Sequence, residues 1–118
     1  MAKQLETSEK AKKDYLKTRY YKTNILLIME HVKKYFEEQS DIKIISYDTN
    51  YNEISVENPM YNMTLRFVQV KASEAAVDLF IDSYFVFDFS KTKNVINNFY
   101  EMLNQKFELI GLALHKED

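Results

Sequence analysis

Four acidic residues, Glu74, Asp78, Asp82 and Asp88, lie within a short stretch of the chain. Neighbouring carboxylates could bind a hard divalent cation or perform acid–base catalysis. In a helix Asp78 and Asp82 would lie about 6 Å apart, whereas in a strand they would share one face about 13 Å apart, too far for one ion. Because we favour a strand here, we interpret these acids as a solvated face.

The chain offers few other residues for catalysis. Its two histidines, His31 and His115, have no Cys, His or Glu at a metal-ligand spacing, and we expect His31 at the edge of a helix's apolar face. No serine lies in a G-x-S-x-G motif. The absence of cysteine excludes thiolate nucleophiles, disulfides and Cys-based metal sites, and the single glycine, Gly111, excludes glycine-rich phosphate loops. We therefore expect no enzyme activity, no metal and no cofactor.

Basic side chains outnumber acidic ones in residues 1–22. The candidate contacts for an anionic partner are Lys10, Lys12, Lys13, Lys17, Arg19 and Lys22, interleaved with Tyr15, Tyr20 and Tyr21. Tyrosine rings could stack on the bases of a single-stranded nucleic acid while lysines hold its phosphates. The net charge of −2 opposes a dedicated nucleic-acid binder. An acidic protein partner would suit the same residues equally well.

Aromatic residues are the most abundant unusual feature, with nine tyrosines and eight phenylalanines in 118 residues. They gather in the sheet segments, where one buried face should hold only part of them. Exposed aromatic surface usually marks an interface. We expect a partner-binding surface, in its simplest form a homodimer, at Tyr61, Phe67, Tyr84, Phe85, Phe87 and Phe89.

The first element that must position these residues is a long N-terminal helix. Apolar residues recur at helical spacing from Tyr21 through Ile28 and Val32 to Phe36. We predict one helix from Ser8 to Glu38. Residues 1–22 would form a polar, basic helical arm that can fray, because its apolar residues are sparse.

The pattern then changes from a period of 3.6 to a period of 2. It predicts strands over Asp41–Asp48, Asn52–Glu57 and Met60–Lys71. We expect Asn50 to take a left-handed conformation in the first turn, and Asn58–Pro59 to form the next turn. Such short connections favour an antiparallel meander.

The segment Lys71–Ser83 fits either a helix or a strand. Ser73, Glu74 and the alanines after them could begin a helix. We prefer a strand, because Val77, Leu79 and Ile81 alternate with polar or aromatic residues and would continue the meander. The aromatic segment Tyr84–Phe89 would extend or follow this strand.

A C-terminal helix should follow, with Ser90 as its N-cap. Val95, Ile96, Phe99 and Leu103 recur at helical spacing. The sequence leaves two possible ends for this helix. Either it stops near Lys106 and residues 107–114 form a last strand, or it continues to Gly111.

These elements predict one domain over residues 1–118, of the α+β class. We expect a two-layer sandwich with the long N-terminal helix, an antiparallel β-meander of about four strands, a C-terminal helix and a short last strand. The chain lacks an apolar run long enough to span a membrane and the apolar core of a signal peptide, so we expect a cytoplasmic protein with no membrane contact. The preference for lysine over arginine is typical of a low-GC bacterium or its phage.

No motif set in the chain points to a family, and the fold class alone does not assign a function. Our first hypothesis is a non-enzymatic protein-interaction module, such as an adaptor, an inhibitor or a chaperone-like accessory protein. It would bind a protein partner through an aromatic sheet face or the long helix. The alternative is a single-stranded nucleic-acid accessory protein that uses the basic N-terminal helix. A metal-dependent enzyme built on Glu74, Asp78 and Asp82 is the third hypothesis.

Overall fold

The computed structural model describes residues 3–84 and 89–113 of the chain. The described elements in chain order are β1 (Lys3–Glu6), the 3-10 helix η1 (Asp14–Leu16), β2 (Arg19–Tyr21), α1 (Ile25–Glu37), β3 (Lys43–Asp48), β4 (Glu53–Glu57), β5 (Tyr61–Lys71), β6 (Glu74–Ser83), α2 (Phe89–Lys106) and β7 (Leu109–Leu112).

The described strands form one seven-stranded antiparallel sheet in the order β3–β4–β5–β6–β2–β7, with β1 pairing on β6. The strands β3 to β6 are consecutive in the chain and adjacent in space, so they form an antiparallel meander, as one part of a larger sheet. The sheet is larger than predicted, because β1 and β2 come from the N-terminal residues and β7 from the C-terminal ones. The α+β class with an antiparallel sheet is therefore as expected.

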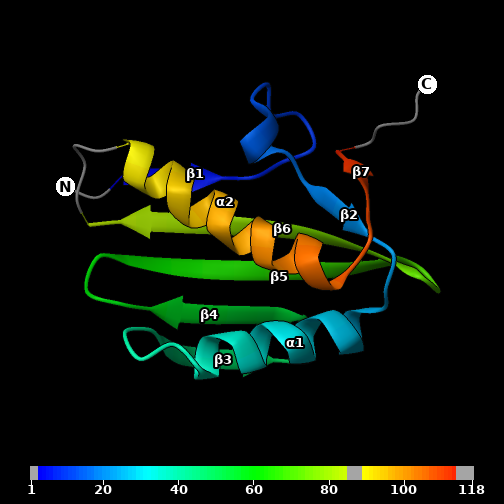
Figure 1. Ribbon diagram of the computed structural model, residues 1–118, viewed down its shortest axis with the longest axis horizontal. Coiled ribbons are helices and arrows are strands. Elements are labelled where there is room, and N and C mark those ends of the chain that lie inside the picture. Colours follow the sequence, from blue (N-terminus) through cyan, green and yellow to red (C-terminus); the bar gives the residue numbers. More distant parts are fainter. Residues whose placement is uncertain (1–2, 85–88, 114–118) are drawn as a thin grey trace.

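Strands β1 and β2 both pair with β6, at different parts of its length. β1 pairs with residues 80–83 and β2 with residues 75–77. Between them residues 7–18, here called the N-terminal excursion, leave the sheet, form η1 and return. Figure 1 shows the excursion as a loop beyond the edge of the sheet, next to α2.

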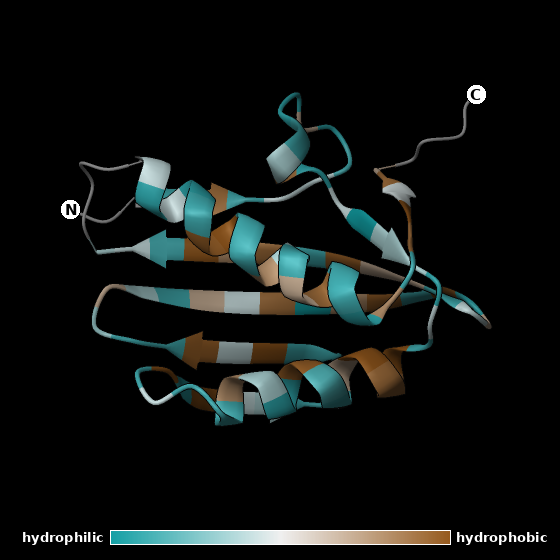
Figure 2. Ribbon diagram, viewed as in Figure 1, coloured by the Kyte–Doolittle hydropathy of each residue, from teal (hydrophilic) through white to brown (hydrophobic). Residues whose placement is uncertain are grey.

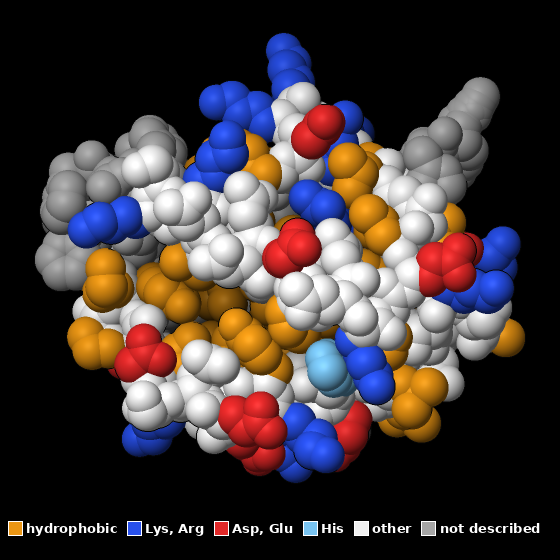
Figure 3. Space-filling model, in the orientation of Figure 1, with side chains coloured by type: hydrophobic (Ala, Val, Ile, Leu, Met, Phe, Trp, Pro, Cys, Tyr) orange, Lys and Arg blue, Asp and Glu red, His pale blue; other side chains and the backbone are white. Residues whose placement is uncertain are grey.

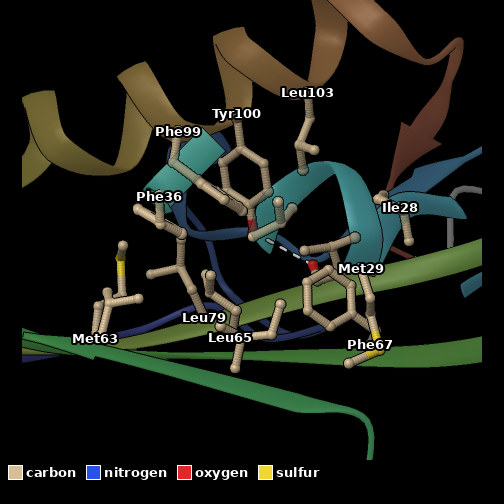
Figure 4. Packing of buried hydrophobic residues seen from close by; sticks show 14 of the residues in the cluster. Ile28, Met29, Phe36, Met63, Leu65, Phe67, Leu79, Phe99, Tyr100 and Leu103 are labelled. Atoms are coloured by element: carbon tan, nitrogen blue, oxygen red, sulfur yellow. Dashed lines mark hydrogen bonds between the residues drawn. The ribbon is translucent and has the colours of Figure 1, made fainter. Parts of the chain in front are cut away.

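Both helices lie over the same face of the sheet, and the core fills the space between the layers (Figure 1). Figure 2 shows hydrophilic residues along the outward side of α2 and of the later turns of α1, whereas the first turn of α1 is hydrophobic and carries the exposed Leu26 and Leu27. Figure 4 shows Phe36 of α1 and Phe99 and Tyr100 of α2 directed toward Leu65 and Leu79 of the sheet. The opposite face of the sheet carries polar side chains such as Thr64 and Asp78, together with the apolar Val68 and Phe80.

The prediction of one helix from Ser8 to Glu38 was wrong in its first half. Helix α1 begins only at Ile25, after Asn24, whose side-chain oxygen accepts a hydrogen bond from the Leu27 N–H. Residues 3–6 and 19–21 are strands, so the described part of residues 1–22 is not a helical arm. The buried Tyr21 belongs to β2 and not to the helical stripe, because pairing with β6 and β7 stabilises an extended backbone there.

The turns follow the sequence less closely than the strands. Asn52, not Asn50, has the positive φ, at 57°. Asp48 explains the shift, because its Oδ1 accepts hydrogen bonds from the N–H groups of Asn50 and Tyr51 and fixes the start of the turn. In the predicted turn at Asn58–Pro59, the Asn58 side chain accepts from the next two N–H groups, those of Met60 and Tyr61.

The two open choices near the C-terminus are resolved. Residues 74–83 form the strand that we preferred, and α2 ends at Lys106 with the short strand β7 after it. Gly111 therefore lies in a strand opposite Tyr20. Ser90 is not the N-cap, because α2 already includes it. Among the described residues, neither helix has the length and apolar character that a membrane crossing requires.

Candidate functional site

A basic groove lies between the N-terminal excursion and the first half of α2. It has a volume of about 1120 Å³, and its cationic lining residues are Lys12, Lys13, Arg19 and Lys93. Asp14 is its acidic member, and Ser90 and Asn97 of α2 add polar groups. Figure 3 shows Lys and Arg side chains gathered around this part of the molecule. We call the set of lining residues the basic groove.

The N-terminal excursion is held at its base, where it leaves and rejoins the sheet. Asp78 of β6 accepts hydrogen bonds on Oδ1 from the hydroxyls of Thr7 and Thr18, each at 2.6 Å. Both threonines are buried. Ser8 adds two backbone bonds, donating to the Leu16 carbonyl and accepting from the Thr18 N–H. The excursion that carries Lys12 and Lys13 is therefore a closed loop with a fixed base.

Aromatic rings hold two of the cations in the groove. The Lys93 Nζ lies 5.0 Å from the centroid of the Tyr15 ring, which links α2 to η1. The Arg19 guanidinium carbon lies 4.4 Å from the centroid of the buried Tyr100 ring. Cations attract aromatic faces electrostatically at such distances. Both side chains are thus positioned at the groove by contacts that leave their charge in place.

The charges of the groove favour an anion. Asp14 is already paired with Lys17, with 3.1 Å between its Oδ1 and the lysine Nζ. The Nε of Arg19 is buried and has no hydrogen-bond partner in the described structure. A buried N–H donor without an acceptor is costly. Because this atom is buried, the charge of the Arg19 guanidinium, and not its Nε–H, is what the groove presents. The groove therefore offers several cations to an anionic ligand.

Only some of the predicted basic residues meet in the groove. Lys12, Lys13 and Arg19 line it, whereas Lys10 and Lys22 are exposed and are not among its lining residues. Lys17 is occupied by Asp14. The predicted cluster was therefore divided by the fold, because the excursion turns back between Lys10 and Arg19 where a helix would have continued.

The three tyrosines of this segment point in different directions. Tyr15 lines the groove. Tyr20 pairs opposite Ala76 on the helix-free face and donates from its hydroxyl to Glu9, while Tyr21 is fully buried and donates to Asn104. Burial raises the pKa of both Tyr20 and Tyr21, and the bond to Glu9 raises that of Tyr20 further. Tyr20 and Tyr21 thus cannot form a stacking surface with Tyr15.

The predicted aromatic partner surface is only partly exposed. Phe67 is 1% exposed and belongs to the core, and Tyr61 is half-buried against the core. The prediction was wrong for Phe67, since alternation does not say which sheet face the helices cover. Tyr84 is 41% exposed. Phe85 and Phe87, and the side chain of Phe89, lie outside the described residues.

The acidic residues of β6 do not assemble a metal site. Asp78 and Asp82 share the helix-free face of a strand, as predicted, and the described residues contain no cluster of three potential metal ligands. A small pocket of about 370 Å³ opens beside Asp78, but its Arg66 is paired with Glu53 at 2.9 Å and Asp78 already accepts two hydroxyls. Asp88 lies outside the described residues.

His31 has the helix-edge position that we expected. Its ring packs edge-on against Phe107, with 5.5 Å between the centroids. Burial lowers the pKa of His31, and the nearby Lys106 and Lys34 lower it further against an opposing contribution from Glu38. The imidazole is therefore held toward its neutral form by its packing. His115 lies outside the described residues.

Three polar groove residues were missed from the sequence. Ser90, Lys93 and Asn97 lie on α2, more than 65 residues after Lys22 at the end of the predicted basic segment, and only the fold brings them to it. A helical-face pattern could have identified them, because Ser90, Lys93 and Asn97 follow the spacing of one polar face. Nothing local indicates that this face meets residues 12–19.

Comparisons with protein-family models, with curated proteins and with solved structures find no match to this chain. The chemistry of the basic groove therefore carries the functional proposal by itself.

Proposed function

We propose that the protein is a non-enzymatic interaction module that binds an acidic segment of a protein partner in the basic groove. The observation that supports this most is the convergence of Lys12, Lys13 and Arg19 with Lys93 from a distant helix. An adaptor, an inhibitor or a chaperone-like accessory protein would work in this way. Our first hypothesis placed the partner on an aromatic sheet face or on the long helix. We now propose that the partner binds in the basic groove instead.

The surroundings of the groove support specificity for an acidic partner. The chain as a whole has a net charge of −2, so a basic groove stands against an acidic background. Complementary local potentials steer association and select the partner, even where each exposed ion pair adds little affinity. An acidic segment would be attracted to the groove and repelled by the remaining surface.

Single-stranded nucleic acid remains the second candidate, because Tyr15 and the lysines of the groove resemble a stacking and phosphate-binding set. The orientation of the tyrosines favours the protein partner. Tyr15 already contacts Lys93, Tyr20 is turned to the other sheet face, and Tyr21 is buried. One ring offers a nucleic acid little stacking energy.

Fluorescence anisotropy with a labelled decaglutamate peptide tests the proposal. We expect salt-sensitive binding by the wild-type protein and a loss of about tenfold or more in affinity for the double variant Lys12→Glu/Lys93→Glu, since two cations become anions. The control Lys34→Glu/Lys106→Glu changes the net charge equally, and both lysines are exposed in the last turns of α1 and α2, outside the groove. It should change the affinity by less than about twofold.

A parallel titration with labelled oligo-dT distinguishes the two candidates. Tighter binding of oligo-dT than of decaglutamate, lost in the groove variant, would replace the acidic protein segment with single-stranded nucleic acid. If neither probe binds, or if both double variants weaken binding equally, the groove is not the binding site.

The remaining expectations stay predictions. A homodimer through the aromatic surface would need residues other than the buried Phe67. The lack of enzyme activity, the cytoplasmic location and the low-GC bacterial or phage origin are also still predictions from the sequence.

A further inference from the structure

Strand β3 ends the sheet on the side away from the groove. It is first in the strand order and pairs with β4, and no other described strand pairs with it. Its Ile45 is 53% exposed. An edge strand presents unpaired backbone N–H and C=O groups, which another strand can complete. Another strand can therefore pair with this edge, and the residues of β3 determine which strand is complementary to it.

Strand β3 contains a bulge, and the residues on either side of it alternate regularly between the two faces of the sheet. The register with β4 shifts between Ile44 and Ser46, so that Ile45 is the extra residue. Without it, five regular positions remain, and they alternate between the two faces of the sheet. Lys43, Ser46 and Asp48 lie on the helix-free face, whereas Ile44 and Tyr47 lie on the core face.

This pattern is complementary to itself in the antiparallel direction. When Ser46 is placed opposite a second Ser46, Lys43 falls opposite the partner's Asp48, and Ile44 falls opposite the partner's Tyr47. The Lys43–Asp48 ion pair then occurs twice in the symmetric dimer, once on each side of the axis. The apolar pair continues the core, because Ile44 and Tyr47 already pack against it from the rim.

We propose that β3 pairs antiparallel with β3 of a second copy, joining the two sheets around a two-fold axis at Ser46. In this register paired residues occupy the same faces, so the helices of both copies cover the same side of the joined sheet. A parallel pairing would place Lys43 beside the partner's Lys43 and Asp48 beside the partner's Asp48, where like charges repel. The surface is separate from the basic groove and does not depend on the groove's ligand.

Cysteine cross-linking tests this register directly, because the chain contains no cysteine of its own. Ser46 is exposed, and Ser46→Cys would bring two thiols to the axis. Directly opposite Cβ atoms lie about 5 Å apart, close enough for a disulfide after small adjustments. We expect rapid formation of a covalent dimer at micromolar protein under mild oxidation, measured on non-reducing gels.

Two further cysteine variants provide matched controls. Thr49 lies one residue beyond β3, and in the proposed register its Cα is about 20 Å from that of the partner's Thr49. Ser73 is exposed in the turn between β5 and β6, far from the edge. Thr49→Cys and Ser73→Cys should therefore cross-link at least tenfold more slowly than Ser46→Cys.

Removing one charge tests the ion pairs without disturbing the turn. Asp48→Asn keeps a side-chain oxygen for the N–H groups of Asn50 and Tyr51 but loses both symmetric pairs with Lys43. We expect sedimentation to show a dimer for the wild-type protein and a dissociation constant roughly fivefold higher for Asp48→Asn. A monomeric wild-type protein, or a Ser46→Cys variant that cross-links no faster than its controls, would overturn the proposal.

Discussion

At the scale of single residues, Asp78 has the widest influence on the groove. Its Oδ1 accepts hydrogen bonds from the hydroxyls of Thr7 and Thr18, which precede it in the chain by 71 and 60 positions. Thr7 in turn accepts from the Leu79 N–H at 2.9 Å. Hydrogen bonds to a charged acceptor are stronger than neutral ones. One carboxylate thereby fixes both ends of the excursion that carries half of the groove's cations.

Replacing this carboxylate should destabilise the protein. Asp78→Ala leaves two buried hydroxyls without their acceptor, and we expect the free energy of unfolding in urea to fall by about 2 kcal/mol. Asp82→Asn is the matched control on the same face of β6, because the Asp82 Oδ1 has no partner among the described residues. Because that oxygen is buried as well as unpaired, removing the charge should not lower the stability, and any loss should be less than about 0.5 kcal/mol. Equal losses in the two variants would contradict the role assigned to Asp78.

Buried tyrosines make stability depend on alkaline pH. Burial raises the pKa of Tyr20, Tyr21 and Tyr100 above the ordinary value, which is about 10. The folded state therefore keeps these protons where the unfolded state loses them. Their stabilising contribution is complete below pH 10 and falls as the pH rises above it. Urea unfolding between pH 8 and pH 11 should show this decline.

Tyr100→Phe should make that decline less steep, because it removes one of the three groups. The Tyr100 hydroxyl donates to the Val77 carbonyl at 3.3 Å, so the variant also has a lower starting stability. The diagnostic quantity is thus the slope with pH and not the stability itself. An unchanged slope would mean that Tyr100 ionises equally in both states.

At the scale of elements, the start of α1 depends on two side chains. Asn24 accepts from the Leu27 N–H at 3.0 Å, and Gln69 of β5 accepts from the Ile25 N–H at 2.9 Å. The first bond is local, because Asn24 is the N-cap residue directly before the helix. The second comes from the sheet, and it places the first turn of α1 over the end of β5.

Loss of the local cap should therefore cost a measurable part of the stability. For Asn24→Ala we expect the free energy of unfolding to fall by about 1 kcal/mol, whereas Asn24→Ser keeps a capping oxygen and should lose less than half of that. Urea denaturation measures both. If the serine variant lost as much as the alanine variant, the cap would not be the cause.

The N-terminal segment shows why the long helix was wrongly predicted. Apolar residues before Ile25 are too sparse to stabilise a helix by packing, and Arg19–Tyr21 instead pairs with β6 and β7. These partners lie more than 50 residues away in the chain. Local spacing contains no information about them. The strands of the meander were predictable because their partners are their neighbours in sequence.

At the scale of the whole molecule, part of the surplus of aromatic rings fills the core. Phe36, Phe67, Phe99, Tyr21 and Tyr100 are all buried in one core between the helices and the sheet. Large rings fill a core with few residues. The two partner surfaces that we propose, the basic groove and the edge of β3, lie at different parts of the molecule. A second copy on β3 would leave the groove accessible.

The sequence by itself determined the α+β class with an antiparallel sheet, and it placed the second half of the N-terminal helix and the C-terminal helix, because hydrophobic periodicity reflects local backbone geometry. It also excluded glycine-rich phosphate loops and cysteine chemistry, since the residues are missing. Only the tertiary structure decided which sheet face is covered, that residues 19–21 form a strand, and that Lys93 joins Lys12 and Lys13 in one groove. The physical reason is that these outcomes depend on the free energy of contacts between segments that are far apart in the chain. No local pattern contains that energy.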